Sequence, residues 1–214
     1  MVEKVYVTYN DVHKLCQEAA PQMLSTLQPQ LMIAIGGGGY VPARILRSFL
    51  KQPGSPNIPI QAIGLSLYEE LPVTDADSPG AVDTIGTKVT RTQWLDFSSL
   101  GGMENLVGKR ILIVDEVDDT RTTLEYAVKE LQKDVEEVSK KLGRGGEKTE
   151  FSIFVLHNKD KQKKGVLPAD AIDDSRYIAA RTVGDVWICY PWEAMDIDEH
   201  DRLAAEQRNK TALA

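Results

Sequence analysis

Apolar residues recur at helical spacing in three parts of the chain. The repeat from Val12 to Leu27 predicts an amphipathic helix, which Asn10 or Asp11 would cap. The repeat from Leu124 to Leu142 predicts a second helix of the same kind. A shorter helix should begin near Pro42, because proline suits a first turn and apolar residues follow it at helical spacing.

Five short runs between these helices have the length and composition of strands. The run at 111–114 reads Ile-Leu-Ile-Val, and those at 31–35 and 151–156 are similarly apolar, which is typical of parallel strands buried on both faces. Residues 59–67 form another such run, and 88–95 alternate polar and apolar side chains. The alternation of strands and helices predicts an α/β fold, a mainly parallel sheet flanked by helices.

One long connection separates two of these strands. Residues 68–86 are rich in Pro, Asp, Ser and Gly and poor in apolar side chains, so we expect a flexible loop there. No repeat, low-complexity tract or clear interdomain linker interrupts the rest of the chain. A length of 214 residues suits one domain with a good core, and we therefore expect a single domain over 1–214.

Composition narrows the classes of protein to consider. The net charge of −7 and pI near 5.1 argue against a nucleic-acid-binding surface, which would carry a basic face. Two cysteines cannot form a disulfide framework, and three scattered histidines do not suggest a metal site. The chain shows no signal-like amino terminus and no run of membrane-spanning length. We expect a cytoplasmic protein without membrane partners.

The most specific stretch follows the apolar run at 111–114. It holds four carboxylates and then three hydroxyls at the start of a helix: Asp115, Glu116, Asp118, Asp119, Thr120, Thr122 and Thr123. Two like charges about 4 Å apart repel by roughly 1 to 4 kcal/mol near a protein surface, so the acids indicate a cation or a polyhydroxyl ligand. Hydroxyls beside the free N–H groups of a helix start favour a phosphate. A capped helix without a ligand is the simpler alternative, but a cap needs one such residue rather than seven.

In this order of residues the stretch resembles the phosphoribosyl-pyrophosphate (PRPP) motif of type I phosphoribosyltransferases. The resemblance implies that Asp115 and Glu116 hold the ribose hydroxyls and Mg²⁺, and that Asp119 is the general acid/base at purine N7. It assigns the 5′-phosphate to Asp119, Thr120, Arg121, Thr122 and Thr123. The family usually has glycine where this chain has Arg121, which leaves open whether the loop adopts a positive φ. An arginine there could instead add a charge-assisted contact to the phosphate.

Four glycines, Gly36, Gly37, Gly38 and Gly39, follow the strand at 31–35. A dinucleotide fingerprint would need a further glycine at position 41, which is Val41, so we do not favour that site. Backbone N–H groups of glycines can approach an anion closely, although a tight turn alone also explains them. In the family this loop binds pyrophosphate and often contains a non-proline cis peptide, which here would be Gly36–Gly37.

Two further segments gain a role from the resemblance. The loop at 157–164 is rich in lysine, which by itself indicates a solvated surface. Residues 186–193 contain two tryptophans and a tyrosine, which by themselves indicate packing against the core. Both resemble parts of 6-oxopurine phosphoribosyltransferases, in a base-binding segment over about 157–200. That family implies that Trp187 stacks on the base and that backbone groups of Ile188 face the edge of the base. It implies that Lys159 donates to the oxygen at C6 and that Glu193 holds metal-bound water or the base. It also places Tyr68 in the flexible loop.

The match extends over about residues 5–200 and is most similar to fungal xanthine and hypoxanthine-guanine enzymes. It implies transfer of ribose 5-phosphate from PRPP to a 6-oxopurine with Mg²⁺ as cofactor, giving GMP, XMP or IMP, in a homodimer or homotetramer. Two alternatives remain: a non-catalytic PRPP-binding regulator, and a phosphoribosyltransferase for another base.

Overall fold

The computed structural model describes residues 3–68, 88–95, 103–169 and 172–212. The strands are β1 (Lys4–Tyr6), β2 (Leu31–Gly36), β3 (Ile60–Tyr68), β4 (Lys88–Gln93), β5 (Arg110–Asp118), β6 (Glu150–Lys159), β7 (Tyr177–Val183) and β8 (Trp187–Cys189). The α-helices are α1 (Tyr9–Thr26), α2 (Tyr40–Leu50), α3 (Thr122–Lys141) and α4 (Ile197–Ala212). Short 3₁₀ turns lie at Met103–Leu106, Asp174–Arg176 and Pro191–Glu193.

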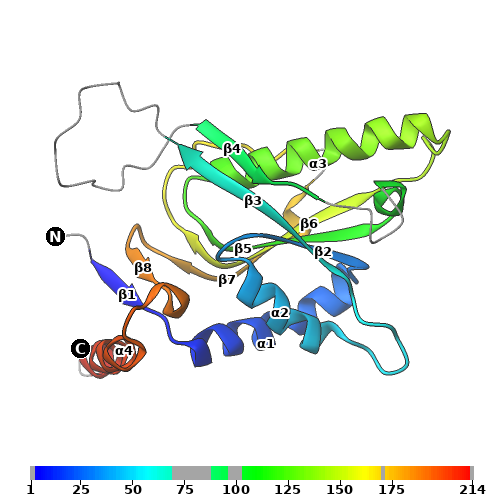
Figure 1. The fold of residues 1–214 in the computed structure, drawn as a ribbon. Helices are drawn as coiled ribbons and strands as arrows, with labels where there is room; N and C mark the ends of the chain where they lie inside the picture. Colours follow the sequence, from blue (N-terminus) through cyan, green and yellow to red (C-terminus); the bar gives the residue numbers. More distant parts are fainter. Residues whose placement is uncertain (1–2, 69–87, 96–102, 170–171, 213–214) are drawn as a thin grey trace, which may run out of the picture.

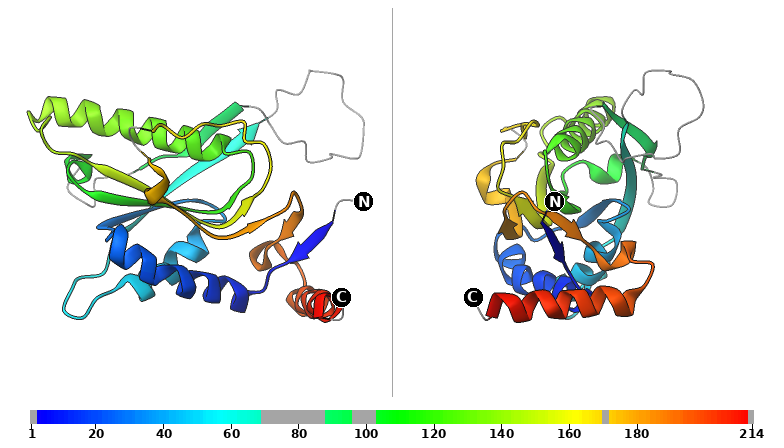
Figure 2. Two further views of the ribbon diagram at one scale, coloured as in Figure 1. Left: turned by 180° about the vertical axis from the view of Figure 1, so that it is seen from behind. Right: turned by 90° about the vertical axis from the view of Figure 1, so that its left-hand side faces the viewer.

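Six strands form the central sheet, in the order β4-β3-β2-β5-β6-β7 (Figure 1). All neighbours in it are parallel except β4, which runs antiparallel to β3 at one edge. Helix α3 covers one face, and α1 with α2 covers the other (Figures 1 and 2). A second, two-stranded sheet pairs β1 with β8, and α4 lies beside it. The predicted α/β class with a mainly parallel, helix-flanked sheet is confirmed.

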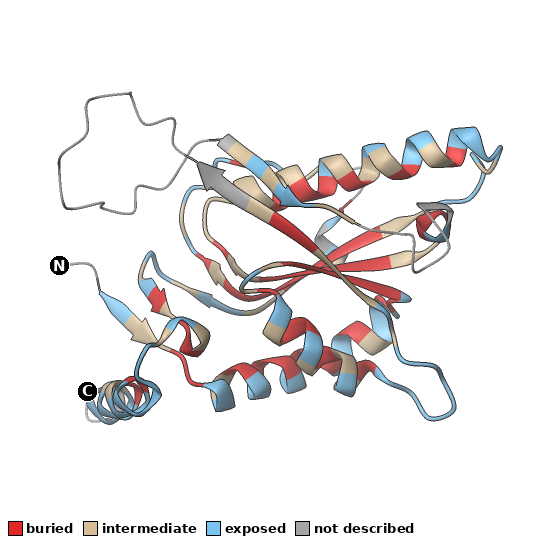
Figure 3. Ribbon diagram, in the orientation of Figure 1, coloured by how far each residue is buried: buried red, intermediate tan, exposed pale blue. Residues whose placement is uncertain are grey.

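Side chains of β5 alternate between the two cores of the protein. Ile111 and Ile113 pack among buried residues of α3, whereas Leu112 and Val114 pack among those of α1 and α2. Because successive strand residues face opposite sides, a continuous apolar run can fill both layers at once. The buried faces of the helices turn toward the sheet (Figure 3).

Several boundaries differ from the sequence expectation. The cap of α1 is Thr8, not Asn10 or Asp11: its hydroxyl accepts from the Asp11 N–H, and the Asp11 carboxylate accepts from the Thr8 N–H. This reciprocal pair satisfies two donors at the helix start, which a cap inside the helix would leave free. Four elements were not predicted at all: β1, β7, β8 and α4.

The carboxyl ends of β2, β5 and β6 meet at one edge of the central sheet, where open α/β sheets hold ligands. Among the described residues, no helix is long and apolar enough to cross a membrane. The expected flexible loop, apart from the end of β3 at Tyr68, lies outside the described residues, and nothing is described of the Tyr68 side chain.

Candidate active site

A pocket of about 220 Å³ lies at the carboxyl end of β5. Its wall contains the acidic stretch and the start of α3, together with Ile35 and Gly36 from the end of β2 and Leu65 from β3. Two motifs that are about 80 positions apart in the sequence therefore share one cavity. A ligand there meets the carboxylates of one loop and the backbone of the other.

The glycine loop lies tightly against this acidic stretch. A Cβ on Gly38 would lie 2.0 Å from Glu116 Cδ, and one on Gly39 would lie 2.4 Å from the Val114 carbonyl oxygen. The Val114 carbonyl belongs to the backbone of β5 and cannot move aside, so packing requires glycine at position 39, whereas the end of the Glu116 side chain can move away from a Cβ at position 38. The peptide bond between Gly36 and Gly37 is cis, as the family resemblance implied.

Asp115, Glu116 and Glu193 lie near one another, and no basic side chain among the described residues forms an ion pair with them. Burial, followed by the charge of Glu116, raises the pKa of Asp115 well above its ordinary value. Burial and the same charge raise the pKa of Glu193. Acids whose protonation is favoured in this way are stabilised as anions when a cation binds.

The donor chemistry of these acids fits Mg²⁺. Carboxylate oxygens are ligands that Mg²⁺ prefers, and it commonly binds through one or two of them with water and substrate phosphate supplying the rest. Among the described residues, no group of three or more His, Cys, Asp or Glu side chains is arranged to hold a metal by itself. Acids of this kind suit a cation that water and substrate phosphate also bind.

Asp119 lies between two lysines, Lys159 at the end of β6 and Lys161 just after it. Its carboxylate oxygens are 3.0 Å from Lys159 Nζ and 3.0 Å from Lys161 Nζ. Burial alone would raise the pKa of Asp119, but the hydrogen bonds and charges of Lys161 and Lys159 outweigh it and lower the pKa. Asp119 is therefore an ionised carboxylate at neutral pH, which is the form that accepts a proton.

Asp185 connects this cluster to the aromatic segment. Lys161 Nζ lies 2.8 Å from Asp185 Oδ1, two positions before Trp187. Trp187 begins β8, and 49% of its surface is exposed, while Ile188 is buried. An exposed indole at this place is available to a flat ligand, as base stacking requires.

A buried chain of hydrogen bonds joins the same segment to β5. The Tyr190 hydroxyl donates to the Glu116 carbonyl oxygen at 3.0 Å and lies 2.9 Å from His157 Nδ1. Because that hydroxyl has one hydrogen, its oxygen accepts from His157 Nδ1–H. Trp192 stacks on the Tyr190 ring, with centroids 4.7 Å apart. Tyr190 thus fixes the position of the 190–193 turn against the acidic stretch.

The stability of the protein should depend on pH through His157. Burial, followed by the charge of Arg181, lowers its pKa from 6.5 to about 4. The unfolded chain therefore binds more protons than the folded chain between these values, so stability falls as pH drops from 6.5 toward 4. We expect a loss of up to about 3 kcal/mol in the free energy of unfolding.

Urea unfolding at several pH values, compared between wild type and His157→Gln, measures this loss. The His157→Gln protein should lack that part of the pH dependence, whereas the exposed control His13→Gln should retain it. Parallel curves for wild type and His157→Gln would show that this residue does not titrate as expected.

The sequence did not assign roles to five residues that the structure places around the site: Asp118, Lys161, Lys163, Tyr177 and Tyr190. Asp118 is 1% exposed and accepts hydrogen bonds from Arg121 and Tyr177, while Lys163 Nζ donates to the backbone carbonyls of Asp118 and Asp119. Asp118 belongs to the acidic cluster, Lys161 and Lys163 to the lysine-rich segment and Tyr190 to the aromatic segment, so their residue types were a signal, whereas Tyr177 had none. The other contacts join distant parts of the chain.

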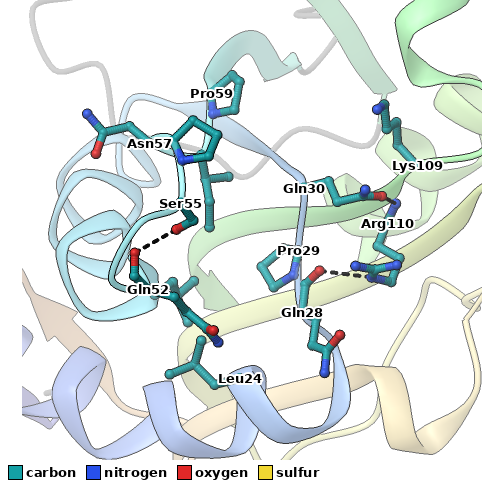
Figure 4. A pocket seen from close by; sticks show the side chains of 13 residues that line it. Leu24, Gln28, Pro29, Gln30, Gln52, Ser55, Asn57, Pro59, Lys109 and Arg110 are labelled. Carbon is teal, nitrogen blue, oxygen red and sulfur yellow. Dashed lines mark hydrogen bonds between the residues drawn. The ribbon is translucent and has the colours of Figure 1, made fainter.

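A second hollow of about 470 Å³ lies at the opposite, amino-terminal edge of the central sheet (Figure 4). Its wall contains side-chain amides, prolines, Lys109 and Arg110, and none of the described residues that line it is an acid. Arg110 is partly engaged already, since its Nε donates to the Gln28 carbonyl and its backbone N–H donates to the Gln30 side chain. This hollow lacks the acids and the helix start found at the end of β5, so we assign the active site to the latter.

Comparison with known proteins shows relatives that match almost the whole chain. The chain is 56% identical over 207 residues to xanthine phosphoribosyltransferase 1 of Saccharomyces cerevisiae, covering 96% of this chain and 97% of that protein. It is 60% identical over 203 residues to the hypoxanthine-guanine phosphoribosyltransferase of Schizosaccharomyces pombe, covering 95% of each.

Among solved structures, a hypothetical protein from Neisseria gonorrhoeae with bound ppGpp is similar, with a TM-score of 0.72 and 36% identity over 97% of this chain and 98% of that one. No protein-family model matches the chain. The identity to the two yeast enzymes over almost the whole of their lengths, together with the PRPP-type motif at the end of β5, shows that this chain belongs to the family of xanthine and hypoxanthine-guanine phosphoribosyltransferases.

Proposed function

We propose that this protein transfers the ribose 5-phosphate unit of PRPP to N9 of a 6-oxopurine, which is xanthine, guanine or hypoxanthine. The products are XMP, GMP or IMP and pyrophosphate. The observation that supports this best is the Asp119 carboxylate, held between Lys159 and Lys161 beside the helix start of α3. It combines a proton acceptor, donors for an oxopurine and a phosphate-binding helix start.

The acidic stretch and the glycine loop bind PRPP in this proposal. The 5′-phosphate binds at residues 119–123, where Thr hydroxyls and N–H groups converge. Asp115 and Glu116 hold the ribose hydroxyls, and Gly36 to Gly39 approach the pyrophosphate. Mg²⁺, held through Asp115, Glu116 or Glu193 and their water, would neutralise the leaving diphosphate. The remaining carboxylate charge stabilises the cationic ribose as its C–O bond breaks.

The base binds between the lysine loop and the aromatic segment. Trp187 stacks on the purine, backbone groups of Ile188 face its edge, and Lys159 donates to the oxygen at C6. Purine N9 forms the new bond to the anomeric carbon, pyrophosphate leaves with the electron pair, and Asp119 accepts the proton at N7. A donor at C6 favours oxopurines over adenine, whose amino group would meet another donor.

Replacing Lys159 with alanine should reduce kcat/KM for the oxopurines by about tenfold or more, because the donor to the C6 oxygen is lost. The KM for PRPP should change less. Lys161→Ala is the matched control, since Lys161 also lies 3.0 Å from Asp119 but is not assigned to the base. Steady-state kinetics with each base measures both effects. If Lys159→Ala leaves oxopurine use unchanged and Lys161→Ala reduces it, the C6 contact belongs to Lys161.

One assay tests the function itself. The purified protein is incubated with PRPP and Mg²⁺ against xanthine, guanine, hypoxanthine, adenine, uracil and orotate in turn, and nucleotide formation is measured. We expect product with one or more oxopurines and none with the other bases. Product only from adenine or a pyrimidine would indicate a transferase for another base. PRPP binding without any product would favour the non-catalytic regulator.

We further propose that the chain acts as a single domain in the cytoplasm and assembles as a homodimer or homotetramer, as the family resemblance implies. Light scattering on the purified protein measures the assembly.

A further inference from the structure

Arg121 has a backbone conformation that side chains rarely adopt. Its φ is 67° and its ψ is −1°, in the left-handed region, at the residue immediately before helix α3. Glycine is the usual residue in such a place, because a Cβ crowds the neighbouring carbonyl oxygen there. The sequence left open whether this loop has a positive φ without the usual glycine, and the structure shows that it has one. Another interaction must therefore stabilise the loop.

The Arg121 side chain makes that interaction with Asp118. Its Nε and Nη2 donate to Asp118 Oδ2 at 3.0 and 2.8 Å, and the Tyr177 hydroxyl donates to the same oxygen at 2.7 Å. The guanidinium also lies over the Tyr177 ring, 5.1 Å from its centroid. A carboxylate that is 1% exposed is stable only when charged or polar partners surround it, so the three side chains hold one another in place.

The loop after β6 also holds this turn in place through hydrogen bonds to its backbone carbonyl groups. Lys163 Nζ donates to the carbonyl oxygens of Asp118 and Asp119 at 2.7 and 2.9 Å. The backbone N–H groups of Lys164 and Gly165 both donate to the Thr120 carbonyl at 3.0 Å. The carbonyl oxygens thus point to that loop, which leaves the N–H groups at the start of α3 free to face a ligand.

We propose that Arg121 is a positioning residue rather than a phosphate ligand: with Asp118 and Tyr177 it holds the left-handed turn that a glycine provides elsewhere, and its side chain does not contact the 5′-phosphate. The backbone of Arg121 remains part of the phosphate loop. The inference rests on the proposed function, because it takes residues 119–123 as the 5′-phosphate site. Two of the donors that an arginine would use to hold a phosphate are engaged with Asp118.

Two substitutions at one position separate the two roles. Arg121→Ala removes the guanidinium and keeps a Cβ, so the turn loses its support. Arg121→Gly removes the guanidinium but adopts a positive φ without strain. If Arg121 positions the turn, Arg121→Ala should bind ribose 5-phosphate about tenfold more weakly, while Arg121→Gly should stay within about threefold of wild type. If Arg121 holds the phosphate directly, both variants should lose affinity equally, and that result would overturn the proposal.

A double-mutant cycle with Asp118→Asn adds a second readout. Asp118→Asn alone should weaken ribose 5-phosphate binding by about tenfold, but in the Arg121→Gly background its effect should fall below about threefold. Additive effects would contradict the coupling. Tyr177→Phe, which removes a single hydroxyl from the cluster, replaces Asp118→Asn if that variant does not fold. Arg202→Ala, which removes an exposed arginine on α4, is the control and should leave binding unchanged.

Calorimetric titration with ribose 5-phosphate gives these affinities, and steady-state kinetics gives the companion values for PRPP. The KM for PRPP should rise in Arg121→Ala while kcat at saturating PRPP changes less, as expected for lost binding of a non-reacting group. Wild-type protein that does not bind ribose 5-phosphate would refute the phosphate site of the proposed function. Wild-type binding with equal losses in both Arg121 variants would refute only the positioning role.

Discussion

Replacing Asp119 with asparagine is expected to lower kcat by about 10²- to 10⁴-fold, the usual contribution of a general acid or base. Lys161 and Lys159 hold the pKa of Asp119 below its ordinary value, so it is ionised and ready to accept the purine proton. An asparagine has nearly the same shape but accepts no proton. The KM values for base and PRPP should therefore change by no more than about threefold.

Asp185→Asn is the matched control for this experiment. Asp185 contacts Lys161 from the other side, so the substitution removes one negative charge from the same cluster without touching Asp119. Its kcat should stay within about threefold of wild type. Rapid-quench kinetics on both variants separates the chemical step from product release. Full turnover by Asp119→Asn with unchanged binding would show that another group takes the proton.

The parts of the fold that the sequence predicted are those with strong local patterns. The strands at Leu31–Gly36, Arg110–Asp118 and Glu150–Lys159 are apolar on both faces because each is covered by helices on both sides. Helices α1 and α3 have apolar stripes that face this sheet. In each case burial and periodicity indicate the same element, so the pattern alone is sufficient.

The elements that were missed have weak local patterns. Strand β7 reads Tyr-Ile-Ala-Ala-Arg-Thr-Val and lies at the sheet edge, with Arg181 and Thr182 exposed. Helix α4 is mostly polar, and Ala204 and His200 are its buried residues among those described. β1 and β8 have three residues each and are strands because they pair with one another. Tertiary contacts, rather than propensity, decide such segments.

The candidate site also has parts that the sequence predicted and parts that it did not. Residue types in order predicted a phosphate loop and a ligand for the cluster of acids, whereas the base-binding segment was predicted from the family resemblance alone. The ion pairs between Asp119 and Lys159 or Lys161 span about 40 positions, and the bond from Tyr177 to Asp118 spans 59. No local pattern encodes such contacts. They require the parallel order β5-β6-β7, which places the carboxyl ends of β5 and β6 side by side and the Tyr177 side chain, at the start of β7, within reach of Asp118.

This arrangement links the two halves of the reaction. Lys159 contacts the base in the proposed function and lies at the end of β6, and both Lys159 and Lys161 contact Asp119 at the phosphate loop. Tyr190 in turn joins the aromatic segment to the backbone of Glu116. A displacement of the base-binding segment would therefore move the groups that hold the ribose, and the two sites should respond together to substitutions in either.

Gly39→Ala should be the most damaging substitution for the fold, with a loss of about 3 kcal/mol or more in the free energy of unfolding. A Cβ at this position would lie 2.4 Å from the Val114 carbonyl oxygen and 2.6 Å from that of Ile35. These are backbone atoms of β5 and β2 in the middle of the central sheet, so they cannot move aside as a flexible side chain could.

Gly37→Ala is the control in the same loop, because a Cβ there would have no neighbour within 4 Å. Its free energy of unfolding should stay within about 1 kcal/mol of wild type, although pyrophosphate binding could still suffer. Urea unfolding followed by circular dichroism compares the two variants. Equal stability of the two variants would mean that the ends of β2 and β5 can shift to make room for a methyl group at position 39. The loop would then require glycine for ligand binding rather than for packing. A large difference would show that the fold itself demands Gly39, independently of any substrate.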